Sequence, residues 1–69
     1  MSVYPEELQV DHRKNGVVIA TMNRPEVLNA LNGSMRIAIR QLVTDVKKDP
    51  SARALILTGA GNAFCSGAD

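Results

Sequence analysis

The last eleven residues of the chain have the composition of a ligand-binding loop. A short apolar run at 54–58 leads directly into the sequence Gly59-Ala60-Gly61-Asn62-Ala63-Phe64-Cys65-Ser66-Gly67-Ala68-Asp69. Glycines let the main chain approach a ligand and adopt φ values that a Cβ forbids. Residues 66–69 also have the composition of a helix start, whose first N–H groups have no partner within the helix. Such a place suits an anion or a developing oxyanion.

The segments before this loop predict a β-hairpin. Residues 8–12 alternate apolar and polar side chains, as a half-exposed strand does, and Asn15-Gly16 is the strongest short hairpin signal. Residues 17–22 are β-branched and almost continuously apolar, which predicts a strand covered on both faces. Residues 54–58 are predicted to form another buried strand.

A helix is predicted between these strands. Asn32 is a suitable N-cap, and Pro50 stops the helix after Asp49. The apolar positions have the spacing of one helical stripe, which we expect to face the core: Met35, Ile39, Leu42, Val43 and Val46.

Strand, helix and strand in this order predict a βαβ crossover with parallel strands. Ligands of such units bind beyond the carboxyl ends of the strands. The loops at 23–31 and 59–69 both follow a strand, so we expect them to lie side by side. Residues 1–7 are predicted to be a flexible lead-in, and residues 8–69 one α/β unit.

Two nucleotide-binding patterns fit the glycines poorly. A Rossmann fingerprint needs Gly-x-Gly-x-x-Gly, and its third glycine position is occupied by Phe64. A P-loop needs a lysine after its last glycine, and the chain has no lysine beyond Lys48. A mononucleotide-binding βαβ module therefore remains only a lesser alternative.

The two loops together resemble the crotonase family, the enoyl-CoA hydratase/isomerase superfamily. The residues that carry the resemblance are Asn-Arg-Pro-x-x-x-Asn-Ala-Leu at 23–31 and Ala-Phe-Cys-Ser-Gly-Ala-Asp at 63–69. The resemblance covers about residues 8–69 and implies an α/β fold, a ββα spiral core. Only its opening hairpin, helix and following strand are expected here, truncated at residue 69.

The resemblance also implies the roles of individual residues. Contacts to the CoA moiety fall in the first loop on Glu26, Val27, Leu28 and Ala30, and in the second on Ser66, Ala68 and Asp69. The backbone N–H of Ala68 matches one of the two donors that hold the thioester oxygen. We expect no metal and no tightly bound cofactor, with coenzyme A present as part of the substrate.

The implied function is that of an enzyme that binds acyl-CoA thioesters and stabilises an enolate oxyanion. Hydration of trans-2-enoyl-CoA in fatty-acid metabolism is the leading expectation. The alternatives are enoyl-CoA isomerisation or other crotonase chemistry, and a non-catalytic acyl-CoA-binding relative. The family's general acid and base glutamates match no position here, so we expect the 69-residue chain alone to be inactive. A homotrimer or hexamer is expected of the full-length protein.

Composition excludes other classes of function. The net charge is +1, with eight basic residues scattered among seven carboxylates, which argues against nucleic-acid binding. No apolar run is long enough for a membrane span, and no signal-peptide pattern opens the chain. A single cysteine excludes an internal disulfide and favours a cytoplasmic protein. A chain of 69 residues buries only about 60% of its unfolded surface, so we expect part of a longer protein.

Several polar or reactive residues have a simpler structural interpretation. Cys65 is expected to fill a tight loop and Phe64 to anchor that loop in the core. His12 is expected to be solvated, and Asn29 to bond its own loop backbone. Arg24 is assigned equally to a CoA phosphate or to a salt bridge that fixes the loop. Asp69 is favoured as a helix cap.

Overall fold

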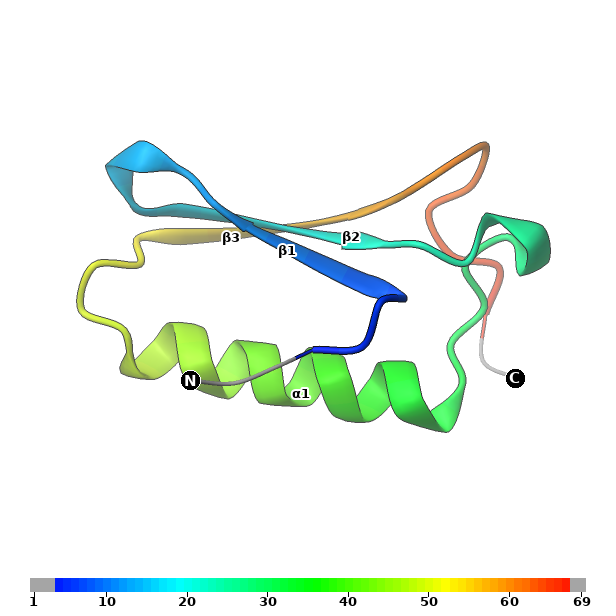
Figure 1. Ribbon diagram of the computed structural model, residues 1–69, viewed down its shortest axis with the longest axis horizontal. Helices are drawn as coiled ribbons and strands as arrows, with labels where there is room; N and C mark the ends of the chain where they lie inside the picture. Colours follow the sequence, from blue (N-terminus) through cyan, green and yellow to red (C-terminus); the bar gives the residue numbers. More distant parts are fainter. Residues whose placement is uncertain (1–3, 68–69) are drawn as a thin grey trace.

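The computed structural model describes residues 4–67 of the chain. In chain order its elements are β1 (Leu8–His12), the short 3-10 turn η1 (Lys14–Gly16), β2 (Val17–Met22), a second 3-10 turn η2 (Pro25–Val27), α1 (Gly33–Lys48) and β3 (Ala54–Gly59). The strands form one sheet in the order β1-β2-β3, and α1 lies against one face of it (Figure 1). The predicted α/β arrangement is confirmed.

The hairpin forms at the Asn-Gly pair, as expected. Asn15 and Gly16 both have positive φ, 57° and 78°, which these two residue types tolerate better than others. The N–H of Arg13 donates to the carbonyl of Val17 at 2.8 Å and closes the turn. The antiparallel register then runs from Leu8 opposite Met22 to His12 opposite Val18.

The helix begins and ends where the sequence signals place it. The side chain of Asn32 accepts a hydrogen bond from the N–H of Met35 at 2.8 Å, which satisfies one of the unpaired donors of the first turn. The helix ends at Lys48 with Asp49 as its C-cap, immediately before Pro50. Both of the predicted boundary signals are confirmed.

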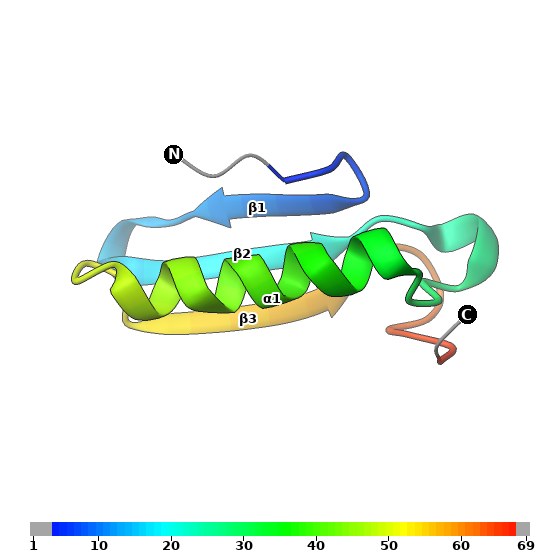
Figure 2. The same cartoon turned by 90° about the horizontal axis from the view of Figure 1, so that it is seen from below.

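The stripe of α1 that packs on the core includes Ala38 in place of the predicted Val43, while Ile39 and Val46 pack against the core as predicted. Its fully buried residues are Met35, Ala38 and Leu42, and Val43 is 38% exposed. Successive helical residues are about 100° apart around the axis. Leu42 points into the sheet, so Val43 is turned toward its margin, and the prediction that it belongs to the core is wrong. Figure 2 shows α1 lying over β2 and β3, nearly parallel to both strands.

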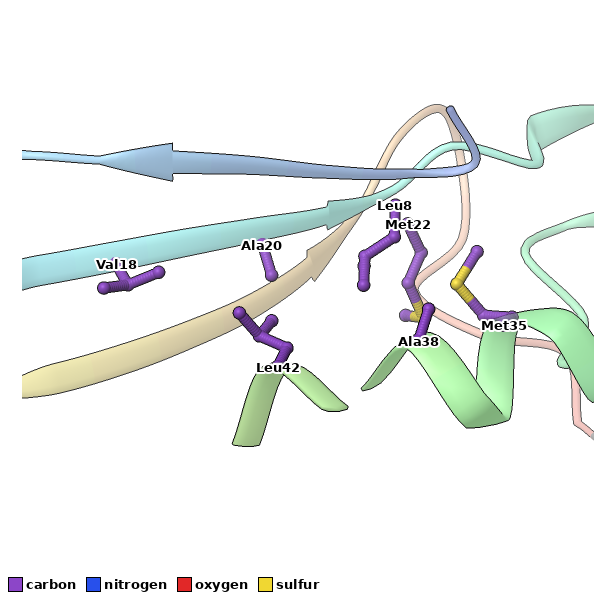
Figure 3. Close-up of a cluster of buried hydrophobic side chains, with 7 residues drawn as sticks. All are labelled: Leu8, Val18, Ala20, Met22, Met35, Ala38 and Leu42. Atoms are coloured by element: carbon purple, nitrogen blue, oxygen red, sulfur yellow. The ribbon is translucent and has the colours of Figure 1, made fainter. Parts of the chain in front are cut away.

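The core lies between α1 and the central strand. Its buried residues come from β1, β2 and α1: Leu8, Val18, Ala20, Met22, Met35, Ala38 and Leu42. In Figure 3 the side chains of β2 point toward α1, and Leu42 and Met35 point back toward the sheet. Alternation along β2 follows from the two-residue period of a strand.

The expectations that β2 is covered on both faces and that β3 is a buried strand are wrong for the described residues. Val17, Ile19 and Thr21 on the far face of β2 are half-buried, and on β3 Ile56 is 48% exposed. The reason is geometric, since α1 covers one face and no other described element covers the opposite one. β3 is also the edge of this three-stranded sheet.

The parallel pairing of β2 and β3 decides where the two loops lie. The register runs from Val17 beside Ala54 to Met22 beside Gly59, so both strands end at the same edge of the sheet. The loops that leave these ends lie together at one end of the molecule (Figure 1). None of the helices in the described part of the chain is both long and apolar enough to cross a membrane.

Candidate functional site

The first loop, residues 23–31, is folded tightly on the backbone of Arg24. The carbonyl of Arg24 accepts hydrogen bonds from the N–H groups of Val27 at 3.1 Å and Asn29 at 2.8 Å. Leu28 and Asn29 follow the 3-10 turn with positive φ, 52° and 59°. A left-handed conformation is uncommon for leucine, and such outliers concentrate at sites under functional constraint.

The side chain of Arg24 fixes this loop from within. Its Nη1 donates to the carbonyl oxygen of Ala30, and its Nε lies 3.7 Å from the carboxylate of Glu7. The side chain is 14% exposed. Of the two roles left open for Arg24, these contacts favour the structural one.

The second loop, residues 59–67, is bonded directly to the first. The N–H of Leu31 donates to the carbonyl of Gly67 at 2.9 Å, and Ser66 Oγ donates to the carbonyl of Val27 at 3.2 Å. Asn29 Nδ2 donates to the carbonyls of Ala60 at 2.9 Å and Ala63 at 2.7 Å. The expectation that the two loops lie side by side is confirmed.

Two glycines allow the second loop to turn this closely. A Cβ at Gly59 would lie 2.6 Å from the carbonyl oxygens of both Ala63 and Phe64, which is inside van der Waals contact. Gly61 has a φ of +83°, and a Cβ there would lie 3.0 Å from Pro25 of the first loop. The glycine spacing therefore serves the contact between the loops, as well as any approach to a ligand.

The joined loops expose apolar side chains at the carboxyl edge of the sheet. Val27 is 39%, Leu28 50% and Phe64 56% exposed. The expectation that Phe64 is a core anchor is therefore wrong. The next residue, Cys65, packs against the core instead. Cys65 thus takes the filler role predicted for it.

The structure places the predicted site residues on these two loops as far as it describes them. Glu26, Val27 and Leu28 are exposed on the first loop, and Ser66 is exposed on the second. Ala30 is buried, at 9% exposure. The predicted oxyanion donor Ala68 and the predicted cap and CoA contact Asp69 lie outside the described residues. Neither Ser66 nor Gly67 lies in a helix.

Asn29 does more than its sequence context indicates. It was expected to bond its own loop, and it does so through Oδ1, which accepts from the N–H of Arg24 at 2.8 Å. Its amide also reaches the other loop, 31 and 34 residues further along the chain. A local sequence pattern cannot predict this contact, because the contact depends on the parallel register of β2 and β3.

A hollow of about 200 Å³ lies at the opposite edge of the sheet beside the hairpin turn. There Arg13 Nε pairs with Asp11 at 2.6 Å, and Asp49 accepts from the N–H and hydroxyl of Ser51. The two hydrogen bonds from Ser51 lower the pKa of the Asp49 carboxyl below its ordinary value. His12 is exposed there, as expected. Among the described residues, no group of three or more His, Cys, Asp or Glu side chains is placed to hold a metal ion.

Comparison with known proteins identifies the family. Residues 12–69 match the family model for enoyl-CoA hydratase/isomerase. The chain belongs to the enoyl-CoA hydratase/isomerase family. This confirms the resemblance in the two loop motifs and assigns the fold to the crotonase type.

Relatives within this family carry different reaction names. The chain is 41% identical over 63 residues to 1,2-epoxyphenylacetyl-CoA isomerase of Escherichia coli K12, covering 91% of the chain and 24% of the relative. It is 46% identical over 56 residues to 3-hydroxyisobutyryl-CoA hydrolase 1 of Arabidopsis thaliana, covering 81% of the chain and 15% of the relative. The crystal structure of an enoyl-CoA hydratase from Mycobacterium marinum has a TM-score of 0.86 and 41% identity, covering 91% of this chain and 29% of that one. The chain thus spans about a quarter or less of the length of these curated relatives.

Proposed function

We propose that the two joined loops bind an acyl-CoA thioester and that the backbone N–H of Ala68 polarises its carbonyl. The observation that carries the proposal is the set of hydrogen bonds that joins the loops at the carboxyl ends of β2 and β3. This edge is where ligands bind in open α/β sheets. Membership of the enoyl-CoA hydratase/isomerase family supports a thioester as the ligand.

The residues of the site suit the parts of such a ligand. Val27 and Leu28 offer exposed apolar contacts to the CoA moiety, beside the exposed carboxylate of Glu26. Ser66 and Gly67 are small, so the pantetheine arm has room to pass close to the main chain. Coenzyme A takes part as a portion of the substrate, and the proposal requires no resident cofactor or metal.

The chemistry requires a donor at the thioester oxygen. Addition of water to a 2-enoyl thioester, or removal of an α-proton, moves negative charge onto this oxygen. Preorganised N–H donors stabilise that enolate, and each contributes about 3–4 kcal/mol to the transition state. By family resemblance, Ala68 supplies one donor, and a glycine N–H elsewhere in the complete protein supplies the second.

The general acid and base are not among the described residues. Glu7 lies beside Arg24 in the lead-in, and Glu26 is exposed on the loop assigned to CoA. We therefore propose hydration of trans-2-enoyl-CoA in fatty-acid metabolism for the complete protein, with proton transfer by residues outside 4–67. By family resemblance we expect a homotrimer or hexamer, and the single cysteine favours a cytoplasmic location.

Enoyl-CoA isomerisation is the second candidate. The family model that the chain matches covers isomerases as well as hydratases, which favours this candidate. The first loop and the oxyanion donor would serve both reactions, since both pass through an enolate of the thioester.

Incubation of the complete protein with crotonyl-CoA tests the proposal. We expect loss of the conjugated enoyl absorbance and a product heavier by one water, whereas isomerisation of a longer enoyl-CoA would leave the mass unchanged. Titrations with ADP and NAD serve as controls. Equal affinity for plain ADP and for crotonyl-CoA would contradict thioester binding, and preferential binding of NAD would favour the nucleotide module instead.

A further inference from the structure

Asn29 is the buried polar side chain at the centre of the two-loop site. It is 1% exposed, and its amide makes three hydrogen bonds. Oδ1 accepts from the N–H of Arg24 at 2.8 Å, within the first loop. Nδ2 donates to the carbonyls of Ala60 and Ala63, at 2.9 and 2.7 Å, in the second loop. One side chain therefore belongs to both loops.

The surroundings of this amide fix its orientation. Its partners are one N–H group and two carbonyl groups, which match one acceptor and two donors. Turning the amide over would place Nδ2 against the N–H of Arg24 and Oδ1 against two carbonyl oxygens. Such an arrangement would leave buried groups unsatisfied, which costs more than a hydrogen bond normally contributes.

Along the sequence, Asn29 follows the proposed CoA contacts directly, and its partners in the second loop come shortly before the proposed oxyanion donor. Residues 26–28 immediately precede Asn29, and Ala63 lies five residues before Ala68 in the second loop. The amide also lies against the start of the second loop, because a Cβ at Gly59 would be 2.7 Å from Nδ2. Asn29 has a positive φ of 59°, a conformation that asparagine adopts at less backbone cost than most residue types.

We propose that Asn29 is the positioning residue that sets the second loop, and with it the Ala68 N–H, relative to the CoA bound on the first loop. Asn29 does not touch the reacting atoms and acts through the main chain of residues 60–63. The hydrogen bonds of Asn29 to both loops are called the clamp below. This inference rests on the proposed function, because the clamp is taken to place the oxyanion donor.

Two substitutions in the complete protein remove different sets of the hydrogen bonds that Asn29 makes. Asn29→Asp keeps the acceptor for Arg24 N–H and sets a carboxylate oxygen against the carbonyls of Ala60 and Ala63. Asn29→Gly keeps the positive φ and removes the side chain. Because a misplacement on the order of 1 Å costs up to ~100-fold, we expect both to lower kcat for crotonyl-CoA about tenfold or more. Affinity for CoA should stay close to wild type in Asn29→Asp.

Asn32→Ala is the matched control. Asn32 is also an asparagine that bonds backbone, but it caps α1 and touches neither carbonyl of the second loop. Its loss should lower thermal stability and leave kcat unchanged. Amide hydrogen exchange in the same four proteins should rise across residues 60–67 only in the two Asn29 variants.

Each result decides between the possibilities. Unchanged kcat in both Asn29 variants, with faster exchange at 60–67, would overturn the role in positioning. Unchanged exchange at 60–67 would overturn the clamp itself. Complete absence of acyl-CoA turnover in the wild type would overturn the proposed function and the catalytic purpose of the clamp, while the exchange data would still show whether Asn29 holds the loops together.

Discussion

Ala68→Pro should lower turnover of crotonyl-CoA by the complete protein about 10²- to 10³-fold, the usual cost of one oxyanion donor. Proline lacks the backbone N–H that the proposal places at the thioester oxygen. The CoA contacts on the first loop do not depend on this group, so affinity for CoA should change little. Steady-state kinetics with crotonyl-CoA, together with a titration with CoA, measure the two quantities separately.

Ala68→Gly is the control for this substitution. Glycine keeps the N–H and removes only a methyl group, so turnover should remain within a small factor of wild type. Activity that survives in Ala68→Pro would show that another group polarises the thioester. Equal loss of activity in both variants would assign the effect to the methyl group of Ala68 and contradict the backbone role.

Gly59→Ala should destabilise the protein by about 1–3 kcal/mol, as overpacking does at tightly packed positions. The new Cβ would lie 2.6 Å from two carbonyl oxygens of the second loop and 2.7 Å from Asn29 Nδ2. These are backbone atoms and a fully bonded amide, so relief requires the loop to move. Denaturant unfolding of the complete protein measures the loss, and acyl-CoA turnover should fall with it.

Gly33→Ala provides the matched comparison. Apart from its chain neighbours and the adjacent backbone of α1, no atom lies within 4 Å of a Cβ built at Gly33, which is the first residue of this helix. Alanine is a better helix former than glycine by about 0.5–1 kcal/mol, so this variant should be as stable as wild type or slightly more stable. Equal stability of Gly59→Ala and Gly33→Ala would contradict the close approach of the second loop to the end of β3.

The elements of the fold follow from local signals in the sequence. The Asn15-Gly16 turn, the Asn32 cap and the stop before Pro50 each act within a few residues, and each is found where it was predicted. The position of the site follows as well. Two strands joined by one helix are parallel, so the loops after Met22 and Gly59 must meet at one edge.

The burial of individual side chains depends on which face another element covers. Apolar sequence alone assigned Val43, both faces of β2 and the whole of β3 to buried positions, and α1 covers only one side of the sheet. Phe64 was also assigned to the core, but it is exposed, and its neighbour Cys65 packs against the core in its place. The bonds from Asn29 to the second loop required the tertiary arrangement, since more than thirty residues separate the partners.

Hydrogen exchange of the complete protein, with and without ligands, tests the central claim most directly. Crotonyl-CoA should slow exchange both in residues 26–31 and in the second loop through Ala68, because the thioester lies between them. ADP should slow exchange in the first loop alone. Protection by crotonyl-CoA confined to the hairpin turn at 12–18, or absent from both loops, would contradict a thioester site at this edge of the sheet.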